Sequence, residues 1–221
     1  MNNNSVIAFI HAKGNSKRVK NKNIKKLKNR PLIYYAITKA LKCKLIDKVV
    51  IDSDSDKILK IGKSFGATPI KRPKNLANNK VGGDELALYQ ASLFPESKIC
   101  VQFVPTSPLI KISTLEDCIK AVSGKYDSAI TIFEDSFYQW KNGKPTYYQK
   151  GRLPNGVELP KTIFETTGLY VNKTKSIFKL KRRFNVKKCY LKKVTRIETV
   201  DLNNYDDFSF AESINFDDYN C

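Results

Sequence analysis

The chain has 221 residues, 41% of them hydrophobic, which is enough for one large domain with a sizeable core. Its apolar runs are far shorter than the roughly 20 residues of a membrane helix, and its scattered cysteines and single histidine exclude a disulfide scaffold and a zinc site of nitrogen and sulfur ligands. The net charge of +19 predicts an anionic partner, such as nucleic acid, a membrane surface or a phosphorylated small molecule, although an AT-rich genome would also produce this excess of lysine.

The first predicted element is a strand at residues 5–11, an almost unbroken apolar run that is typical of a parallel sheet buried on both faces. The sequence then turns small, flexible and cationic at residues 12–18 and stays rich in lysine as far as Lys25. A basic loop with a glycine, at the carboxyl end of a buried strand, is typical of phosphate binding, because its N–H groups face the anion and its lysines balance the charge. A solvated basic surface without a ligand is the alternative.

Helix-like and strand-like patterns alternate along the rest of the chain. We expect helices at residues 31–41, 54–65, 84–93, 114–122, 174–178 and 205–213, and strands at residues 48–53, 67–70, 98–104, 128–133, 168–171 and 190–194. Pro31 suits the first turn of its helix, and Asp84 suits an N-cap. This alternation predicts an α/β fold with a mostly parallel, twisted sheet flanked by helices. The loops after residues 11, 53, 71 and 104 then meet at the carboxyl edge of the sheet, where such sheets bind ligands.

Residues 135–165 break the alternation. This segment is too long and too rich in aromatic residues, proline and glycine to be a simple loop. We interpret it as an arm or hairpin insertion in a single domain of residues 1–221, either for contact with a second subunit or as a lid. An ordinary crossing connection is the alternative, and we expect the tail after Asn215 to fray.

The absent motifs narrow the chemistry. The single histidine, His11, leaves no Ser-His-Asp triad, and we expect it to be a packing residue at the end of the first strand. Neither the P-loop sequence nor the dinucleotide-binding fingerprint is present. The remaining cations suit a triphosphate: Lys13, Lys17, Arg18, Lys20 and Lys22. Asp201 suits Mg²⁺, which takes one or two carboxylates together with phosphate oxygens and water. These residues predict attack on a nucleoside triphosphate, catalysed mainly by positioning and charge neutralisation.

The motifs, taken in order, resemble one known family. Residues 7–27 (IAFIHAKGNSKRVKNKNIKKL) are similar to the opening of the cytidylyltransferases that activate 2-keto-3-deoxy sugar acids, above all the CMP-sialic acid synthetases. The resemblance continues through PLIYYAI (31–37), DKVVIDSDSDKI (47–58), GATPIKRP (66–73), PTSPLI (105–110), ELPK (158–161) and VDLNNYDDFSFAE (200–212). It covers nearly the whole chain in the same order and spacing, and it implies a Rossmann-like nucleotidyltransferase fold.

The resemblance also implies a role for individual residues. It assigns nucleotide binding to Ala12, Lys13, Gly14, Asn15, Ser16, Lys22, Asn23, Arg72 and Gly83. It assigns acceptor binding to Val104, Thr106, Ser107 and Thr167, and Mg²⁺ binding to Asp201 and Asn203. Lys13 and Lys22 are the implied catalytic residues, which meet the negative charge on the phosphates, and Arg72 lies near the cytosine. The implied reaction joins CMP from CTP to the anomeric oxygen of a sugar acid and releases pyrophosphate, in a homodimer whose arm reaches the partner subunit.

On the nucleotide side, the chain departs from the family pattern at few positions. His11 replaces a proline, and Lys13 replaces an arginine, which keeps the charge but loses the bidentate fork. Asn203 replaces the second metal aspartate, and its carbonyl oxygen still suits Mg²⁺ although one negative charge is lost. Residues 79–83, around the expected base, differ from the usual D-T-A-S-like run.

On the acceptor side, the departures are more numerous. Val104 replaces a glutamine implicated in sugar contacts, Ile110 replaces a frequent arginine, and Gly156 stands near another usual arginine. Residues 166–168 (TTG) replace an N-G-A motif. The resemblance therefore implies a mostly intact nucleotide site and an altered acceptor.

Three functions stay open. The first is a cytidylyltransferase whose acceptor is a nonulosonic acid of sialic, legionaminic or pseudaminic type, Kdo, or a phosphorylated or phosphonate acid. The second is an enzyme of the same fold that uses another nucleotide, such as GTP. The third is a non-catalytic binder of nucleic acid or of an acidic surface, which lacks support from any RNA-recognition signature. We expect a cytoplasmic protein without a membrane partner, because the N-terminus lacks the charged region and cleavage site of a signal peptide.

Overall fold

The structure is a computed structural model that describes residues 5–148 and 151–216. The fraying expected after Asn215 concerns mainly residues 217–221, which lie outside the described residues. Within the described ranges, no helix has the length and apolar character that a membrane span requires.

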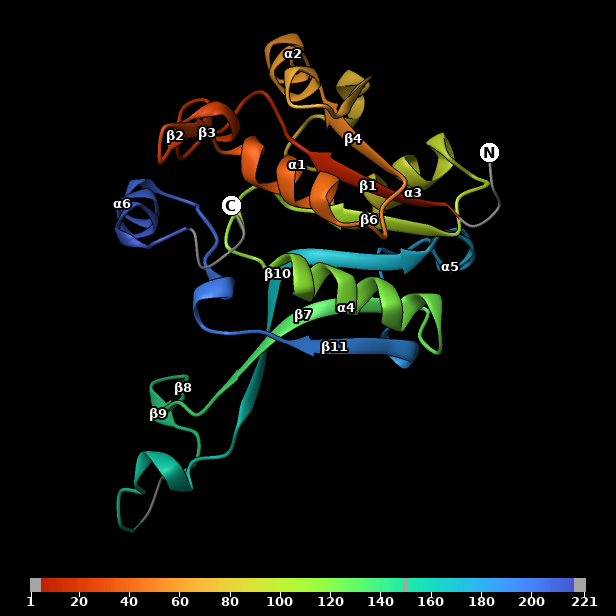
Figure 1. Ribbon diagram of the computed structural model, residues 1–221. Helices are drawn as coiled ribbons and strands as arrows, with labels where there is room; N and C mark the ends of the chain where they lie inside the picture. The colour runs from red at the N-terminus through yellow and green to blue at the C-terminus, as the bar shows by residue number, and fades with distance from the viewer. Residues whose placement is uncertain (1–4, 149–150, 217–221) are drawn as a thin grey trace.

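A seven-stranded sheet runs through the centre of the molecule (Figure 1). Its strands, in spatial order, are β11 (Cys189–Lys193), β7 (Ser128–Asp135), β10 (Thr162–Lys173), β6 (Ile99–Phe103), β1 (Val6–His11), β4 (Lys48–Ser53) and β5 (Thr68–Lys71). Neighbouring strands are parallel, except that β10 runs antiparallel to both β6 and β7. The predicted α/β class with a mostly parallel sheet is therefore confirmed.

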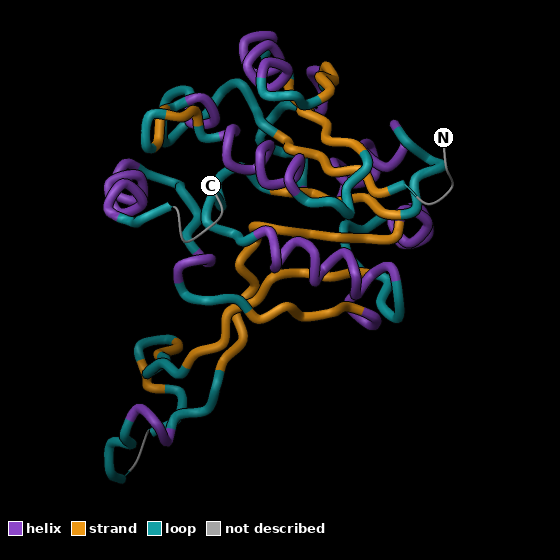
Figure 2. Tube along the Cα trace, in the orientation of Figure 1, coloured by secondary structure: helices purple, strands orange, loops and turns teal. Residues whose placement is uncertain are grey.

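Helices cover both faces of this sheet (Figure 2). They are α1 (Ile33–Lys42), α2 (Asp56–Ser64), α3 (Gly83–Leu93), α4 (Ile112–Ser123), α5 (Thr174–Leu180) and α6 (Tyr205–Ser213). Because side chains alternate along a strand, Ala8 and Ile10 of β1 pack on one face with α1 and α4, whereas Ile7 and Phe9 pack on the other face with α3 and α5. Both faces are apolar, which explains the unbroken hydrophobic run of β1.

Shorter elements lie outside the seven-stranded sheet and its helices. Two small hairpins pair β2 (Lys26–Leu27) with β3 (Arg30–Pro31), and β8 (Trp140–Lys141) with β9 (Lys144–Pro145). Single 3₁₀ turns lie at Lys22–Ile24, Lys74–Leu76, Gly156–Glu158, Val186–Lys188 and Ile197–Thr199.

The predicted elements all occur, with three corrections at their ends. Pro31 belongs to β3 and not to the first turn of a helix, because residues 26–31 form a tight hairpin with Lys28 and Asn29 at positive φ. Asp84 lies inside α3, whose N-cap is Gly82, and its carboxylate accepts the backbone N–H of Arg183 at 2.8 Å. The expected strand at residues 168–171 is only the middle of β10, which is 12 residues long.

Residues 135–148 and 151–165 belong to a hairpin that leaves the body of the molecule (Figure 1). Its base is the antiparallel pairing of β7 and β10, which continues from the sheet as far as Asp135 and Thr162. The hairpin presents large apolar side chains to solvent: Trp140 is 63% exposed and Val157 is 95% exposed. Its predicted role as a dimer contact or a lid stays a prediction.

Candidate active site

The basic loop that follows β1 is fixed against the loop that follows β4. The backbone N–H of Ala12 donates to the carbonyl of Asp52 at 2.9 Å, and the N–H of Gly14 donates to Oδ1 of Asp54 at 2.8 Å. A Cβ atom at Gly14 would lie 2.8 Å from Cβ of Ser55, so the close approach of the two loops requires glycine at this position. The Gly14 N–H is thereby already engaged, and of the predicted cradle it is Asn15 and Ser16 that line the adjacent cavity.

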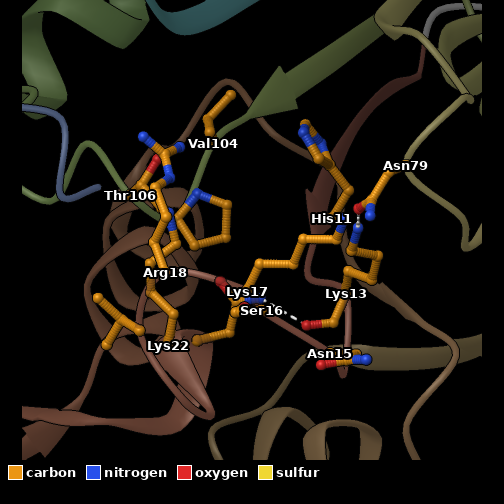
Figure 3. Close-up of a pocket in the computed structure, with 13 residues that line it drawn as sticks. His11, Lys13, Asn15, Ser16, Lys17, Arg18, Lys22, Asn79, Val104 and Thr106 are labelled. Carbon is orange, nitrogen blue, oxygen red and sulfur yellow. Dashed lines mark hydrogen bonds between the residues drawn. The ribbon is translucent and has the colours of Figure 1, made fainter. Parts of the chain in front are cut away.

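A cavity of about 330 Å³ opens between this loop and the end of β6 (Figure 3). Its lining residues are His11, Lys13, Asn15, Ser16, Lys17, Arg18, Val19, Lys22, Asn23, Asn79, Val104, Pro105 and Thr106. Four of these carry a positive charge, and among the described residues that line it none carries a carboxylate. This cationic cavity lies at the carboxyl ends of β1 and β6, as the sequence predicted for a ligand site in a parallel sheet.

Lys13 and Asn23 both line the cationic cavity and are linked by a hydrogen bond. The Nδ2 of Asn23 donates to the backbone carbonyl of Lys13 at 2.8 Å, which fixes the loop at its basic residue. The ammonium group of Lys13 donates to Oδ1 of Asn79, an exposed residue of the loop before α3. No local pattern singles out Asn79, which lies in a polar loop without a motif.

Lys22 lies at the opposite side of the cavity, beside the segment that precedes α6. Its Nζ donates to the carbonyl of Leu202 at 2.9 Å and lies 3.5 Å from Oδ1 of Asn203. Burial lowers the pKa of Lys22, and the nearby carboxylates of Asp201 and Asp207 oppose this shift. Lys22 is therefore brought to the predicted metal residues, whereas Lys13 lies across the cavity beside Asn79.

Asp201 fits a role as a ligand for Mg²⁺. Its Oδ1 is buried and has no hydrogen-bond partner among the described residues, whereas its Oδ2 accepts from Nδ2 of Asn203 at 2.6 Å. A buried, unpartnered carboxylate oxygen is costly without a cation or donor. The described part of the chain contains no group of three or more His, Cys, Asp or Glu side chains that would hold a metal by itself. Phosphate oxygens and water would have to complete the coordination.

Arg72 and Gly83 do not line the cationic cavity. The guanidinium group of Arg72 is 4% exposed and pairs with the carboxylate of Asp52, which also accepts from Gln90 at 2.8 Å. Gly83 packs against the Arg183 side chain so closely that a Cβ atom there would collide with the guanidinium group. The structure thus places Arg72 in a buried polar network and Gly83 against Arg183, both outside the lining of the cavity.

His11 lines the cavity and is not only a packing residue. Its Nδ1 is buried and has no partner among the described residues. Burial and the positive charges of Arg72 and Arg183 lower the pKa of His11 from 6.5 to about 3, so the imidazole is neutral at physiological pH. A neutral imidazole can donate or accept a hydrogen bond but is a poor general base.

The predicted acceptor residues are divided between two places. Val104 and Thr106 line the cationic cavity, and Ser107 is buried behind it against Gly168. The turn that carries them is held from below by Lys39, whose Nζ donates to the carbonyls of Pro108 at 2.6 Å and of Ile110 at 2.8 Å.

Thr167 lines a second cavity of about 450 Å³. We call this cavity the phenylalanine groove, and its lining residues are Phe133, Phe137, Phe164, Glu165, Thr166, Thr167, Thr199 and Asp201. The walls of the groove and of the cationic cavity are linked next to Asp201, where the N–H of Leu202 donates to the carbonyl of Thr106 at 2.8 Å. The sequence did not single out the three phenylalanines, because they are spread over β7, the segment that follows it and β10.

Comparisons with known proteins agree with this geometry. A family profile described as cytidylyltransferase matches residues 7–189. An N-acylneuraminate cytidylyltransferase of Escherichia coli is 30% identical over 129 residues, which cover 58% of this chain and 31% of that protein. A pseudaminic acid cytidylyltransferase of Campylobacter jejuni is 26% identical over 184 residues, which cover 77% of this chain and 79% of that protein.

Other similar proteins are longer or more distant in sequence. A Helicobacter pylori protein, named as a pseudaminic acid cytidylyltransferase and a hydrolase, is 27% identical over 94% of this chain and 42% of its own length. The chain therefore spans less than half the length of two of its curated relatives. A solved structure of a CMP:2-keto-3-deoxy-manno-octonic acid synthetase complexed with CTP superposes with a TM-score of 0.69 at 12% identity, covering 95% of this chain and 97% of the other.

Proposed function

The chain belongs to the cytidylyltransferase family, and we propose that it transfers CMP from CTP to an acidic sugar of nonulosonic type with release of pyrophosphate. The observation that carries this proposal is the link between the cationic cavity and Asp201, since Asn203 bonds both Asp201 and Arg18, which lines the cavity. Lys13, Lys22 and Arg18 suit a triphosphate, and the buried oxygen of Asp201 suits the metal that accompanies it.

In this reaction, the anomeric hydroxyl of the acceptor attacks the α-phosphorus of CTP. A new P–O bond forms to the sugar, the bond between the α-phosphorus and its bridging oxygen breaks, and pyrophosphate leaves while the hydroxyl proton passes to solvent. Lys13 and Lys22 stabilise the negative charge that develops on the phosphates. Mg²⁺, when bound at Asp201, would add positive charge at the α-phosphate. Asn23 keeps Lys13 in place through its hydrogen bond to the Lys13 carbonyl.

The phenylalanine groove supports an acceptor with apolar substituents. Three aromatic rings and three threonines line the groove, and its two charged lining residues, Glu165 and Asp201, are acidic. Aromatic rings favour methyl and acyl groups over hydroxyl groups, which would lose hydrogen bonds to water there. A nonulosonic acid with acylamino or deoxy positions therefore suits the groove better than Kdo or a phosphorylated acid. The anionic carboxylate of the acceptor would lie toward the lysines of the cationic cavity.

The arm suits a homodimer contact in a cytoplasmic enzyme. Its exposed side chains include Phe137, Tyr138 and Trp140, which are costly to leave in water. Sedimentation equilibrium of the whole protein, compared with a variant that carries Trp140→Ser and Val157→Ser, tests this proposal. If the wild-type protein were a monomer at all concentrations, the proposed homodimer would be contradicted.

The donor and the acceptor are tested separately. Thermal-shift ranking of CTP, GTP, UTP and ATP should give the largest stabilisation with CTP, because ligand binding to the folded state raises the unfolding temperature. Pyrophosphate release is then measured with CTP, Mg²⁺ and a panel of N-acetylneuraminate, pseudaminate, legionaminate, Kdo and phosphorylated acids. If no acid in the panel led to pyrophosphate release, the transferase proposal would be contradicted. If GTP stabilised the protein more than CTP, GTP would be the donor in place of CTP.

A further inference from the structure

Asn203 lies between groups of opposite charge. Its Nδ2 donates to Oδ2 of Asp201 at 2.6 Å, and its Oδ1 accepts from Nη2 of Arg18 at 2.7 Å. The ammonium group of Lys22 lies 3.5 Å from the same Oδ1. These charges fix the orientation of the amide, because a reversed amide would point its N–H groups at two cations and its oxygen at a carboxylate.

This orientation matters for any metal ion. The Asn203 oxygen already accepts from one cation and lies beside a second, so a third positive charge at that oxygen would be repelled. Oδ1 of Asp201, by contrast, is buried and has no partner among the described residues. One carboxylate oxygen is a weak site for a hard divalent cation unless phosphate oxygens also bind it.

Arg18 is held at the mouth of the cationic cavity by this contact. The residue is exposed and lies in the loop after β1, 185 positions from Asn203 in the sequence. A guanidinium group has five N–H donors in a planar fork, so Arg18 keeps donors for a phosphate while Nη2 is bound to Asn203. Figure 3 shows Arg18 and Lys22 on the same side of the cavity.

We propose that Asn203 is a positioning residue that joins Asp201 to Arg18, and that Arg18 binds the triphosphate in the place of a second metal-carboxylate contact. This inference rests on the proposed function, since it takes the cationic cavity to be the nucleotide site. It follows that the divalent ion enters together with the nucleotide and does not bind to the free protein.

Calorimetric titration of CTP in EDTA tests the positioning role, because a metal ligand has no effect when metal is absent. Arg18→Met and Asn203→Ala should each weaken CTP binding about tenfold or more in EDTA, as expected for loss of a charge-assisted hydrogen bond. The double variant should be no weaker than Arg18→Met alone, because the two residues act as one unit. Arg30→Met removes an exposed arginine that does not line the cavity, and it should leave CTP binding unchanged.

Binding of Mn²⁺, followed by electron paramagnetic resonance, tests the second consequence. The wild-type protein should bind Mn²⁺ in the presence of CTP and not in its absence. The inference would be overturned if Mn²⁺ bound to the free protein and Asn203→Ala abolished that binding. It would also be overturned if Asn203→Ala weakened CTP binding only when metal is present, or if Asn203→Ala and Arg18→Met weakened CTP binding additively. If CTP does not bind to the wild-type protein at all, the proposed function fails and the inference with it. If CTP binds equally to wild type and variants, only the inference fails.

Discussion

Arg72 and Asp52 form a bidentate ion pair that is sealed from solvent. Nε and Nη2 of Arg72 each lie 2.9 Å from a carboxylate oxygen of Asp52, and Nη2 also donates to the Asp52 carbonyl at 2.9 Å. The side chains are 4% and 0% exposed. The pair ties the end of β5 to the end of β4, and the Asp52 carbonyl also accepts from the N–H of Ala12, so Arg72 supports the basic loop through Asp52.

Removal of Arg72 should therefore destabilise the protein strongly. Arg72→Met leaves the Asp52 carboxylate buried without its main partner, and we expect a loss of about 3–5 kcal/mol in the free energy of unfolding. The neighbouring ion pair of Lys71 and Asp56 is the control, because its side chains are 52% and 89% exposed. Lys71→Met should cost less than about 1 kcal/mol. Urea denaturation measures both, and an equal loss in the two variants would contradict the structural role of Arg72.

Gly168 should not tolerate a side chain. A Cβ atom there would lie 2.5 Å from Cδ1 of Ile110 and 2.7 Å from Oγ of Ser107, so alanine must push the turn after β6 out of place. We expect Gly168→Ala to destabilise the protein by about 1–3 kcal/mol. Gly156→Ala is the matched control, because that position has no atom within 4 Å and should be close to neutral. Similar unfolding midpoints for the two variants would show that the turn adapts.

The sequence predicted most of the fold because its local signals agree with the tertiary structure. Buried strands such as β1 are uniformly apolar, and α6 begins at the expected residue after the cap Asn204. The hairpin at residues 26–31 was missed because Pro31 before an apolar run is also typical of a helix start. Motif order located the basic loop and Asp201, which lie about 190 residues apart in the chain but are linked through the contacts of Arg18 and Lys22 with Leu202 and Asn203.

The partners of the site residues were beyond what the sequence could predict. Arg72 follows β5, and its partner Asp52 lies on the neighbouring strand β4. No local sequence pattern shows whether Arg72 binds this carboxylate or a ligand. The contact between Arg18 and Asn203 joins the two ends of the chain in the same way. A polar residue in a motif therefore identifies a site, but its role follows only from the three-dimensional arrangement of charges around it.

The stability of the protein should depend on pH through His11. Its pKa in the folded protein is about 3, below the 6.5 of the free side chain, because of burial and the charges of Arg72 and Arg183. Between these pH values the unfolded chain binds a proton that the folded protein does not, so His11 destabilises the fold as pH falls below 6.5. The expected loss is about 1 kcal/mol per pH unit.

His11→Gln isolates this effect, because His11 is the only histidine of the chain. From pH 7 to pH 5, the unfolding free energy of the wild type should fall more than that of His11→Gln. Chemical denaturation at each pH measures it, and carboxylates contribute equally to both proteins. A constant difference across this range would mean that the pKa of His11 is the same in the folded and the unfolded protein.

Phe164 should determine the use of the acceptor and not the binding of the nucleotide. It lines the phenylalanine groove, forms an edge-to-face contact with Phe137 at 5.6 Å between ring centroids, and is 40% exposed. Phe164→Ala removes an apolar wall, and we expect kcat/KM for a nonulosonic acceptor to fall about tenfold, since roughly 1.4 kcal/mol of apolar contact is lost. Binding of CTP should stay at the wild-type value.

Ile163→Ala is the matched control, because Ile163 is the adjacent residue, is 54% exposed and does not line the groove. Pyrophosphate release at varied acceptor concentration measures both variants, and equal loss in the two, or an effect of Phe164→Ala on CTP binding, would remove the groove from the acceptor site.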